Sequence, residues 1–493
     1  MRRSIVFGAM LALAVAAVPS AQQADTLKAA ADALGVARIK TLQFTGSGAN
    51  FSVGQNFTPS DPWPRVTVKS YTATINYDTG SMRQELLREM GTVMPRGGGA
   101  PFTGEQRQVQ VVSGNYAWNV AAAAPGAAPP PAAAAPGNAV ERMLALWATP
   151  QGFVKAAMVN NATTKKTRDG TEVSFTVGGR YRMAGLINAQ NQVERVQTWI
   201  DQPIVGDMPV ETTYSGYKDF GGVTFPSRIV QKQDGFPSLD LTIASVTANP
   251  AVDITVPENV RTAQPAPVRV ETAKLADGVF YLTGGSHHSL AIEMKDHIVL
   301  VDVPLTEERA LAVIAKTKEV IPNKPIRYLV TSHHHWDHLG GIRTAIDEGA
   351  TIVTHQSNKA FLERVAKTPH TINPDRLSAS KKPLKIQTVG TKGTLTDGTR
   401  TVELHLLTGY EHTGDMLVVY LPKEKILGEP DAFTAPATPT TPLVVTAVPY
   451  AVALFDNIKR LNLDVKTIAP FHGGRLTDVA ELGKAAGKSS TGN

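Results

Sequence analysis

One segment stands out in this chain: Ser332-His333-His334-His335-Trp336-Asp337-His338-Leu339-Gly340-Gly341. The run before it, Ile326-Arg327-Tyr328-Leu329-Val330-Thr331, is apolar and rich in residues that favour strands. Helix-like sequence follows the two glycines. We therefore expect a strand that ends in a loop rich in potential metal ligands, with a helix beyond it.

The spacing within this segment predicts a metal site. His333 and His335 are two residues apart, so at the end of an extended strand both imidazoles project to the same side and can share one metal, while His334 points away. Asp337 and His338 follow where the chain turns and can address a second metal, and Asp337 is also expected to face the reacting centre as a catalytic residue. Nitrogen and carboxylate ligands favour zinc, with iron and manganese as alternatives. A surface run of histidines or a lone structural zinc site fits so demanding a pattern less well.

The pattern His333-x-His335-x-Asp337-His338 resembles the signature of the metallo-β-lactamase fold superfamily. The resemblance implies an αββα sandwich with two divalent metal ions, zinc above all. It also implies further motifs in a fixed order. Asp302, at the end of an apolar strand, matches the aspartate that supports the metal loop through hydrogen bonds. His412 in Gly409-Tyr410-Glu411-His412 matches the third ligand of the first metal, although the family usually has glycine where this chain has Glu411.

Two later motifs complete the implied ligand set. The segment Gly428-Glu429-Pro430-Asp431-Ala432-Phe433 resembles the motif whose aspartate bridges both metals. Many members read Gly-Asp here, which favours Glu429 by position, but the residues after Asp431 match better, so Asp431 is the predicted bridge. His472, in the strand-then-His-Gly motif near the end of the chain, is implied as a ligand of the second metal. His287 and His288 lie in a predicted hairpin turn, where substrate contact is possible and ordinary turn residues are expected.

Composition limits the classes of protein to consider. A chain of 493 residues is too long for one ordinary core, so two or more domains are expected. The net charge of +6 would fall to about +4 without Arg2 and Arg3, and no basic block stands out, so nucleic-acid binding is not expected. The chain has no cysteine, which excludes disulfides and thiolate ligands.

The N-terminus is typical of a secretory signal peptide. Arg2 and Arg3 precede a roughly 14-residue apolar stretch that ends in small residues, too short for a spanning helix. Residues 1–21 are therefore predicted to be removed, and a periplasmic or secreted protein is implied. No later run is long and apolar enough to predict a transmembrane segment.

The first half reads as a mainly antiparallel β domain, predicted over residues 22–262. A helix is expected from Thr26 to about Leu34 and two more near 139–147 and 151–158. Segments that alternate apolar and polar residues predict strands; they are 41–46, 66–77, 106–113, 173–177, 193–200, 210–217 and 239–246. The pattern is faintly similar to the lipoprotein-carrier-like domains of bacterial envelope proteins. The Ala/Pro-rich stretch 121–137 is expected to be a flexible loop.

Histidine usage divides the chain. All twelve histidines lie at or after His287, so the first half is not expected to supply histidine ligands. The Pro-rich stretch 262–267 marks the boundary, and residues 268–493 are predicted to form the metallo-β-lactamase-like domain. Its predicted elements are a hairpin around 284–288, a strand at 297–302, and a helix from Thr306 to Val320 with Thr306 as its cap.

These features predict a metal-dependent hydrolase that acts on a small-molecule substrate with an ester, lactone, thioester or amide bond, using water activated by two metals. The Asp431 bridge argues against β-lactams, because true β-lactamases of this fold generally lack that residue. Two alternatives stay open: an iron-dependent oxidoreductase on the same fold, and an envelope carrier whose sheet binds an apolar ligand, with an accessory metal domain. The sequence does not specify an oligomeric state.

Overall fold

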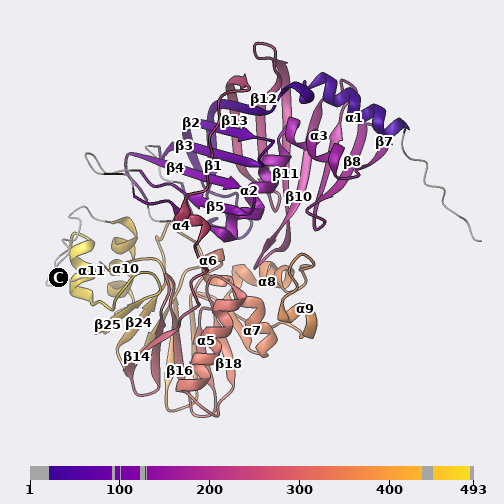
Figure 1. Cartoon of the computed structure of the whole chain (residues 1–493). Coiled ribbons are helices and arrows are strands. Elements are labelled where there is room, and N and C mark those ends of the chain that lie inside the picture. The colour runs from indigo at the N-terminus through magenta and orange to yellow at the C-terminus, as the bar shows by residue number, and fades with distance from the viewer. Residues whose placement is uncertain are drawn as a thin grey trace, which may run out of the picture.

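The computed structural model describes residues 21–91, 95–99, 101–122, 128, 130–435 and 448–488. The predicted signal peptide lies almost wholly outside these residues, as does part of the Ala/Pro-rich loop. The described chain forms a large antiparallel sheet followed by a layered α/β sandwich (Figure 1). None of the described helices has the length and apolar character that a membrane crossing requires.

The first half forms one antiparallel sheet of 13 strands, in the order β6-β5-β4-β3-β2-β1-β13-β12-β11-β10-β9-β8-β7. Its strands are β1 (Thr41–Phe51), β2 (Arg65–Asn76), β3 (Ser81–Glu89), β4 (Glu105–Ser113), β5 (Tyr116–Asn119), β6 (Ala133–Ala134), β7 (Thr163–Thr167), β8 (Gly170–Val177), β9 (Tyr181–Ile187), β10 (Val193–Gln202), β11 (Gly206–Asp219), β12 (Thr224–Gln233) and β13 (Phe236–Ala248). Burial alternates along β1 and β2, as expected for a sheet with one covered face.

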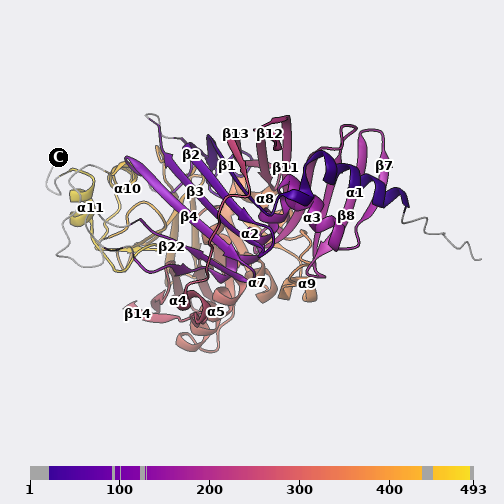
Figure 2. The ribbon, with the colours of Figure 1, turned by 45° about the horizontal axis from the view of Figure 1, so that its top comes forward.

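Three helices cover that face: α1 (Ala21–Ala33), α2 (Ala139–Ala148) and α3 (Pro150–Val159) (Figures 1 and 2). Pro150 starts α3, a position where the missing N–H costs nothing. Phe153 and Leu144 are fully buried between helices and sheet. The three predicted helices and seven predicted strands of this half are all present. The Ala/Pro-rich stretch is not wholly irregular, because it ends in β6 and a short 3-10 helix, η2 (Pro136–Asn138).

The second half is an αββα sandwich of two sheets, as the sequence predicted. The first sheet has the order β14 (Glu271–Ala276), β15 (Val279–Thr283), β16 (Ser289–Glu293), β17 (Ile298–Val301), β18 (Ile326–Val330), β19 (Thr351–His355) and β20 (Lys385–Val389). The second has the order β21 (Lys392–Thr396), β22 (Thr401–Leu406), β23 (Leu417–Leu421), β24 (Ile426–Glu429) and β25 (Thr467–Pro470). Apolar residues of both sheets, such as Val301 and Val419, share one buried cluster between them.

Helices lie outside both sheets (Figure 1). The helices beside the first sheet are α5 (Glu307–Val320), α7 (Ile342–Glu348), α8 (Lys359–Val365) and α9 (Arg376–Ser380). Those beside the second are α10 (Pro449–Arg460) and α11 (Val479–Ala485). Further short helices of the described chain are η1 (Val36–Arg38), α4 (Glu258–Arg261) and η3 (Gln356–Asn358). Thr306 caps α5 as predicted, its hydroxyl oxygen accepting from Arg309 N at 3.2 Å.

Strand direction determines where the loops meet. β17 and β18 run parallel, and so do β24 and β25. Because parallel strands present their carboxyl ends at one edge of a sheet, the loops after all four strands lie at neighbouring edges of the sandwich. Between β18 and α7 the chain forms a single helical turn, α6 (Trp336–Leu339), inside the histidine-rich segment.

The large sheet packs on the sandwich through several of its loops. The β1–β2 loop contacts the histidine-rich segment, and the β10–β11 hairpin contacts residues 370–373, where Asp207 Oδ1 accepts from Thr371 N at 2.8 Å. The stretch 262–267 lies between the last strand of the large sheet and the first strand of the sandwich. We therefore keep it as the proposed boundary between domains 22–262 and 268–493.

Candidate metal centre

Loops at the edge of the sandwich bring together every residue predicted to bind metal. These loops are the segments after β18, between β22 and β23, after β24 and after β25. The residues are His333, His335, Asp337, His338, His412, Asp431 and His472. His333, His335 and His338 are fully buried, as expected for side chains that serve a site rather than solvent.

The first group consists of His333, His335 and His412, whose nitrogens lie within 4.8 Å of one another. His335 Nδ1 is 3.0 Å from His412 Nε2. The hydroxyl of Ser332 donates to Asp302 Oδ2 at 2.6 Å, so it must accept from His333 Nδ1, 3.0 Å away. His333 Nε2 is therefore left with a lone pair, and this buried atom has no hydrogen-bond partner among the described residues.

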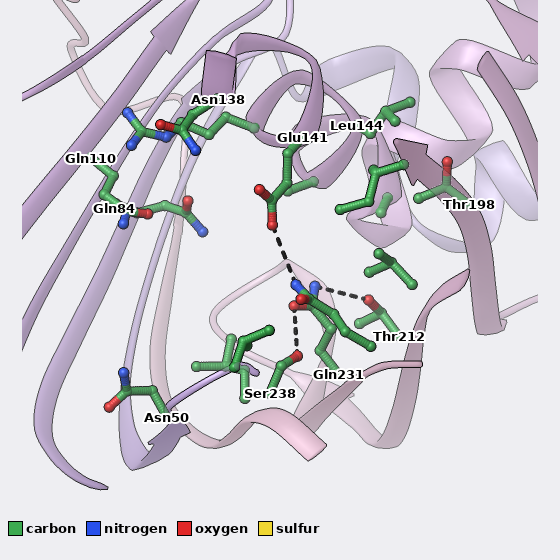
Figure 3. A pocket seen from close by; sticks show the side chains of 18 of the residues that line it. Asn50, Gln84, Gln110, Asn138, Glu141, Leu144, Thr198, Thr212, Gln231 and Ser238 are labelled. Atoms are coloured by element: carbon green, nitrogen blue, oxygen red, sulfur yellow. Dashed lines mark hydrogen bonds between the residues drawn. The ribbon is translucent and has the colours of Figure 1, made fainter. Parts of the chain in front are cut away.

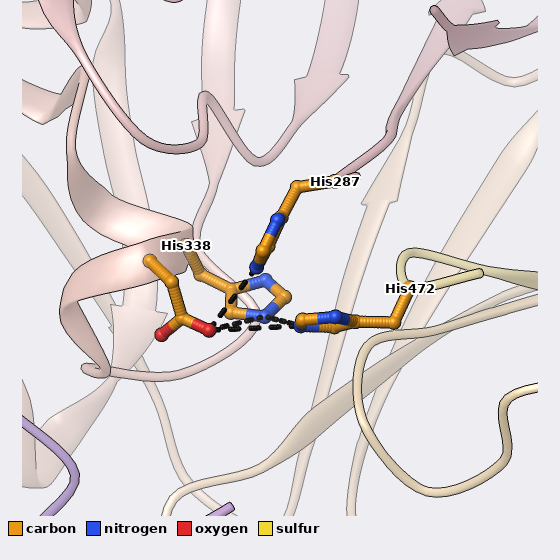
Figure 4. A group of neighbouring side chains, drawn as sticks. His287, His338 and His472 are labelled. Atoms are coloured by element: carbon orange, nitrogen blue, oxygen red, sulfur yellow. Dashed lines mark hydrogen bonds and ion pairs between the residues drawn. The ribbon is translucent and has the colours of Figure 1, made fainter. Parts of the chain in front are cut away.

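The second group consists of Asp337, His338 and His472, together with His287 (Figure 4). His338 Nε2 lies 3.0 Å from His472 Nε2, and His472 Nε2 lies 3.6 Å from Asp337 Oδ2. His338 Nδ1 donates to Asp302 Oδ2 at 2.9 Å, which turns its Nε2 lone pair towards the group. Asp302 thus supports the loop through hydrogen bonds, in the role that the resemblance implied.

Asp431 lies between the two groups. Its Oδ2 atom is 3.1 Å from His333 Nε2, 3.2 Å from His338 Nε2 and 3.3 Å from His412 Nε2, and its Oδ1 atom is 2.8 Å from His472 Nε2. Asp431 Oδ2 and His333 Nε2 are both acceptors, and both lack a hydrogen-bond partner among the described residues. Two buried acceptors facing each other repel unless a cation lies between them, so these residues fit a metal.

Glu429 lies outside these groups. Its Oε2 atom accepts from Ala432 N at 2.8 Å and Phe433 N at 3.3 Å, so the carboxyl group faces the turn that follows it. Complete burial raises the pKa of Glu429 to about 8, which keeps it protonated at neutral pH. The geometry therefore favours Asp431 over Glu429 as the bridge.

The electrostatics of the cluster suit a cation. Burial lowers the pKa of His333 and of His335 well below the usual value, so both are neutral donors at pH 7. Burial would raise the pKa of Asp431, but the imidazoles of His338 and His412 hold it well below its usual range. Burial alone would lower the pKa values of His338 and His472, but the nearby aspartates raise both, that of His472 to about 9. An ionised carboxylate beside the neutral donors His333 and His335 suits a divalent ion, which would displace the protons that His338 and His472 hold without it.

His287 is the residue at the site that sequence reasoning did not claim. Its Nε2 atom donates to Asp337 Oδ2 at 3.1 Å, and its backbone forms an isolated β-bridge with His472. The only sequence signal was its place in a hairpin turn. The neighbouring His288 instead lies against Tyr281 Oη and Pro470 O. His334 points away as predicted and pairs with Asp415 Oδ1 at 2.8 Å.

Comparison with known proteins identifies the family of one part of the chain. Residues 282–472 match the family model described as the metallo-beta-lactamase superfamily. This part of the chain is a metallo-β-lactamase superfamily domain. Members of the superfamily are generally metal-dependent hydrolases, and the histidine and aspartate groups of this metallo-β-lactamase domain could hold a metal. Among curated proteins, no significant match is found.

Solved structures similar to the chain include a metallo-beta-lactamase from Pontibacter korlensis, with 22% sequence identity and a TM-score of 0.34 over 44% of this chain and 97% of that one. The DIM-1 metallo-beta-lactamase is also similar, with 22% identity and a TM-score of 0.33 over 44% and 95% of the two chains. The same enzyme exposed to ceftazidime gives 20% identity, a TM-score of 0.33, and coverages of 44% and 94%.

Proposed function

We propose that the protein is a periplasmic or secreted hydrolase with two divalent metal ions, zinc favoured, that cleaves an ester, lactone, thioester or amide bond in a small molecule. The observation that carries the proposal is the position of Asp431 between two separate donor groups. One tetrahedral ion takes four protein ligands, so a set of seven exceeds what a single zinc uses.

The donors divide between two ions. His333 Nε2, His335 Nδ1 and His412 Nε2 would hold the first ion, and Asp337, His338 and His472 the second, with Asp431 shared. A bound metal pair lowers the pKa of water towards neutrality and polarises the oxygen of the bond under attack. Asp302 and Ser332 fix the ring orientations of His338 and His333 from behind.

Exposure indicates the side from which substrate arrives. The side chains of Asp337 and His472 are 30% and 27% exposed, whereas that of His338 is fully buried. Asp337 is the predicted catalytic residue, and His287 holds its Oδ2 atom at 3.1 Å. We expect the scissile bond to lie beside Asp337 and His472, within reach of both.

A substrate screen tests the hydrolase assignment. Zinc-loaded protein should hydrolyse at least one of a panel of esters, lactones, thioesters and β-lactams, with β-lactams the poorest because of Asp431. Removal of zinc with a chelator should abolish the activity, and added zinc should restore it. Hydrolysis that survives complete metal removal would contradict the assignment.

The oxidoreductase alternative uses the same residues with iron. Imidazole and carboxylate ligands accept either metal, so the donor set alone does not distinguish them. The metal that co-purifies with the protein does. Iron as the main metal, together with oxygen consumption and no hydrolysis, would favour the alternative.

The carrier alternative concerns the large sheet. A cavity of about 260 Å³ lies between α2 and the sheet (Figure 3). Amide and hydroxyl side chains dominate its labelled wall, and Gln231 Oε1 accepts from Ser238 Oγ at 3.0 Å. Apolar side chains such as Leu86, Leu144 and Ile200 line the rest of the cavity. The wall therefore fits a ligand with both polar and apolar groups better than a plain acyl chain, which would leave the amides without partners. A lipid that co-purifies with the full-length chain would support a carrier whose sheet binds an apolar ligand.

A further inference from the structure

Two loops of the large sheet lie directly on the metal-binding residues. The first loop, residues 52–64, joins β1 to β2, and the second loop, residues 95–99, lies in the connection between β3 and β4. The carbonyl oxygen of Asn56 in the first loop accepts from His335 Nε2 at 2.8 Å. The carbonyl oxygen of Gly98 in the second loop accepts from His412 Nδ1. Both histidines belong to the first donor group.

Each carbonyl is hydrogen-bonded to the ring nitrogen that does not face the other donors of the group. A neutral imidazole has one N–H and one lone pair, and the hydrogen bond at one nitrogen decides which nitrogen is left to bind metal. Because Asn56 O accepts a hydrogen bond from the N–H at His335 Nε2, the lone pair of His335 is on Nδ1. Because Gly98 O accepts a hydrogen bond from the N–H at His412 Nδ1, the lone pair of His412 is on Nε2. These two lone-pair atoms face each other at 3.0 Å.

The first loop also reaches the second donor group. Gln55 Nε2 donates to Asp337 Oδ1 at 2.8 Å, so the two oxygens of Asp337 are held by different parts of the chain, Oδ1 by Gln55 and Oδ2 by His287. Gly98 N donates to Gln55 O at 2.8 Å, which ties the two loops together. The loops therefore act as one unit over both groups.

Glu411 explains how the second loop docks. The family usually has glycine at this position, but here Glu411 O accepts from Gly97 N at 2.8 Å and its carboxylate pairs with Arg96 at 3.0 Å. The ion pair is exposed and adds little by itself. Beside it, Phe57 O in the first loop accepts from Gly414 N at 2.9 Å. The segment that carries His412 is thus hydrogen-bonded to both loops.

We propose that the large N-terminal sheet is a structural part of the metal centre, and that its loops orient His335, His412 and Asp337 for metal binding through the carbonyls of Asn56 and Gly98 and the amide of Gln55. Asn56, Gly98 and Gln55 are positioning residues. The inference rests on the proposed metal-dependent function, and it gives the N-terminal half a role that requires none of its residues to be a ligand.

Two glycines with the same φ angle supply a matched test in the full-length protein. Gly54 and Gly104 both have φ +74°, so alanine is equally strained at each. A Cβ atom at Gly54 would lie 2.5 Å from the Trp336 ring, whereas one at Gly104 would have no atom within 4 Å. Gly54→Ala should therefore push the first loop away from the metal residues, and Gly104→Ala should not.

The measurement is zinc affinity by competition with a chromogenic chelator, together with the absorption spectrum of the cobalt-substituted protein. Gly54→Ala should weaken zinc binding by about 10- to 100-fold, the usual cost of losing hydrogen bonds behind metal ligands, and should change the cobalt spectrum. Gly104→Ala should match the wild type in both. Equal affinity and equal spectra for the two variants would overturn the proposal.

A second variant decides the matter if Gly54→Ala does not fold. Gln55→Met keeps the length of the side chain but removes the amide that holds Asp337 Oδ1. It should lower the affinity for the second zinc ion, and wild-type affinity would overturn the proposal. A wild-type protein that binds no zinc would instead contradict the proposed function itself, so the two failures are distinguishable.

Discussion

Asp431→Asn should bind one zinc ion tightly and the second weakly. Turnover should fall by more than the about 10- to 100-fold that is typical when a residue hydrogen-bonded to a metal ligand is replaced. The physical reason is charge. The carboxylate oxygens of Asp431 lie 2.8 to 3.3 Å from nitrogens of four imidazoles, and its negative charge offsets the repulsion between two cations. Asparagine keeps the size and removes the charge. Zinc stoichiometry and turnover in one metal buffer measure both effects.

Glu429→Gln is the matched control for Asp431→Asn. Glu429 is fully buried and protonated at neutral pH, and its Oε2 atom accepts two backbone N–H groups that a glutamine oxygen can also accept. We expect this variant to retain both zinc ions and most of its activity. If Glu429→Gln loses the second ion while Asp431→Asn keeps it, the two roles must be exchanged.

The second large effect is expected for His335→Ala. This change removes a donor from the first group and leaves the carbonyl oxygen of Asn56 without its partner. The remaining donors of that group are His333, His412 and Asp431, so the first ion should bind more weakly and most activity should be lost. Metal content per folded molecule and turnover are the measurements.

His334→Ala is the neighbouring control, and its effect should be on stability. His334 Nδ1 pairs with the buried Asp415, which also accepts from Asn358 Nδ2 at 2.6 Å. Loss of one partner of a buried carboxylate costs about 1–3 kcal/mol of unfolding free energy. Folded His334→Ala should still hold its metals, because His334 belongs to neither donor group. If His334→Ala and His335→Ala lose equal amounts of metal per folded molecule, the prediction that His333 and His335 face the metal while His334 points away is wrong.

The pair His333 and His335 was predictable from local spacing, and the other donors were predicted from the resemblance to the superfamily. Two histidines at a strand end must share a side when they are two residues apart, and parallel strands bring the loops that carry them to one edge. His412, Asp431 and His472 were predicted because the motifs around them resemble those of the superfamily. The structure brings together the predicted residues, and the ligand role of each stays a proposal.

The residues that were missed depend on tertiary contacts. His287 reaches Asp337 only because its hairpin pairs with the loop of His472. The carbonyls of Asn56 and Gly98 could not be predicted, because every residue has a carbonyl oxygen and sequence does not show where it points. The absence of histidine from the first 286 residues suggested that this half takes no part in the metal chemistry, yet its backbone holds two of the donors.

Strands β3 and β12 show a similar limit in the large sheet. Most residues of β3 are only half-buried, and its sequence, Ser-Met-Arg-Gln-Glu-Leu-Leu-Arg-Glu, lacks alternation between apolar and polar residues. β12 contains Pro226, which argues against a strand by itself. Pairing with neighbours on both sides overrides these local preferences.

The central claim is a dinuclear centre carried by residues of the second half and oriented by loops of the first. The most direct test is metal analysis of the full-length protein, purified without exposure to a chelator. We predict about two equivalents of divalent metal per chain, mainly zinc, because two donor groups share Asp431. One equivalent or none would contradict the claim.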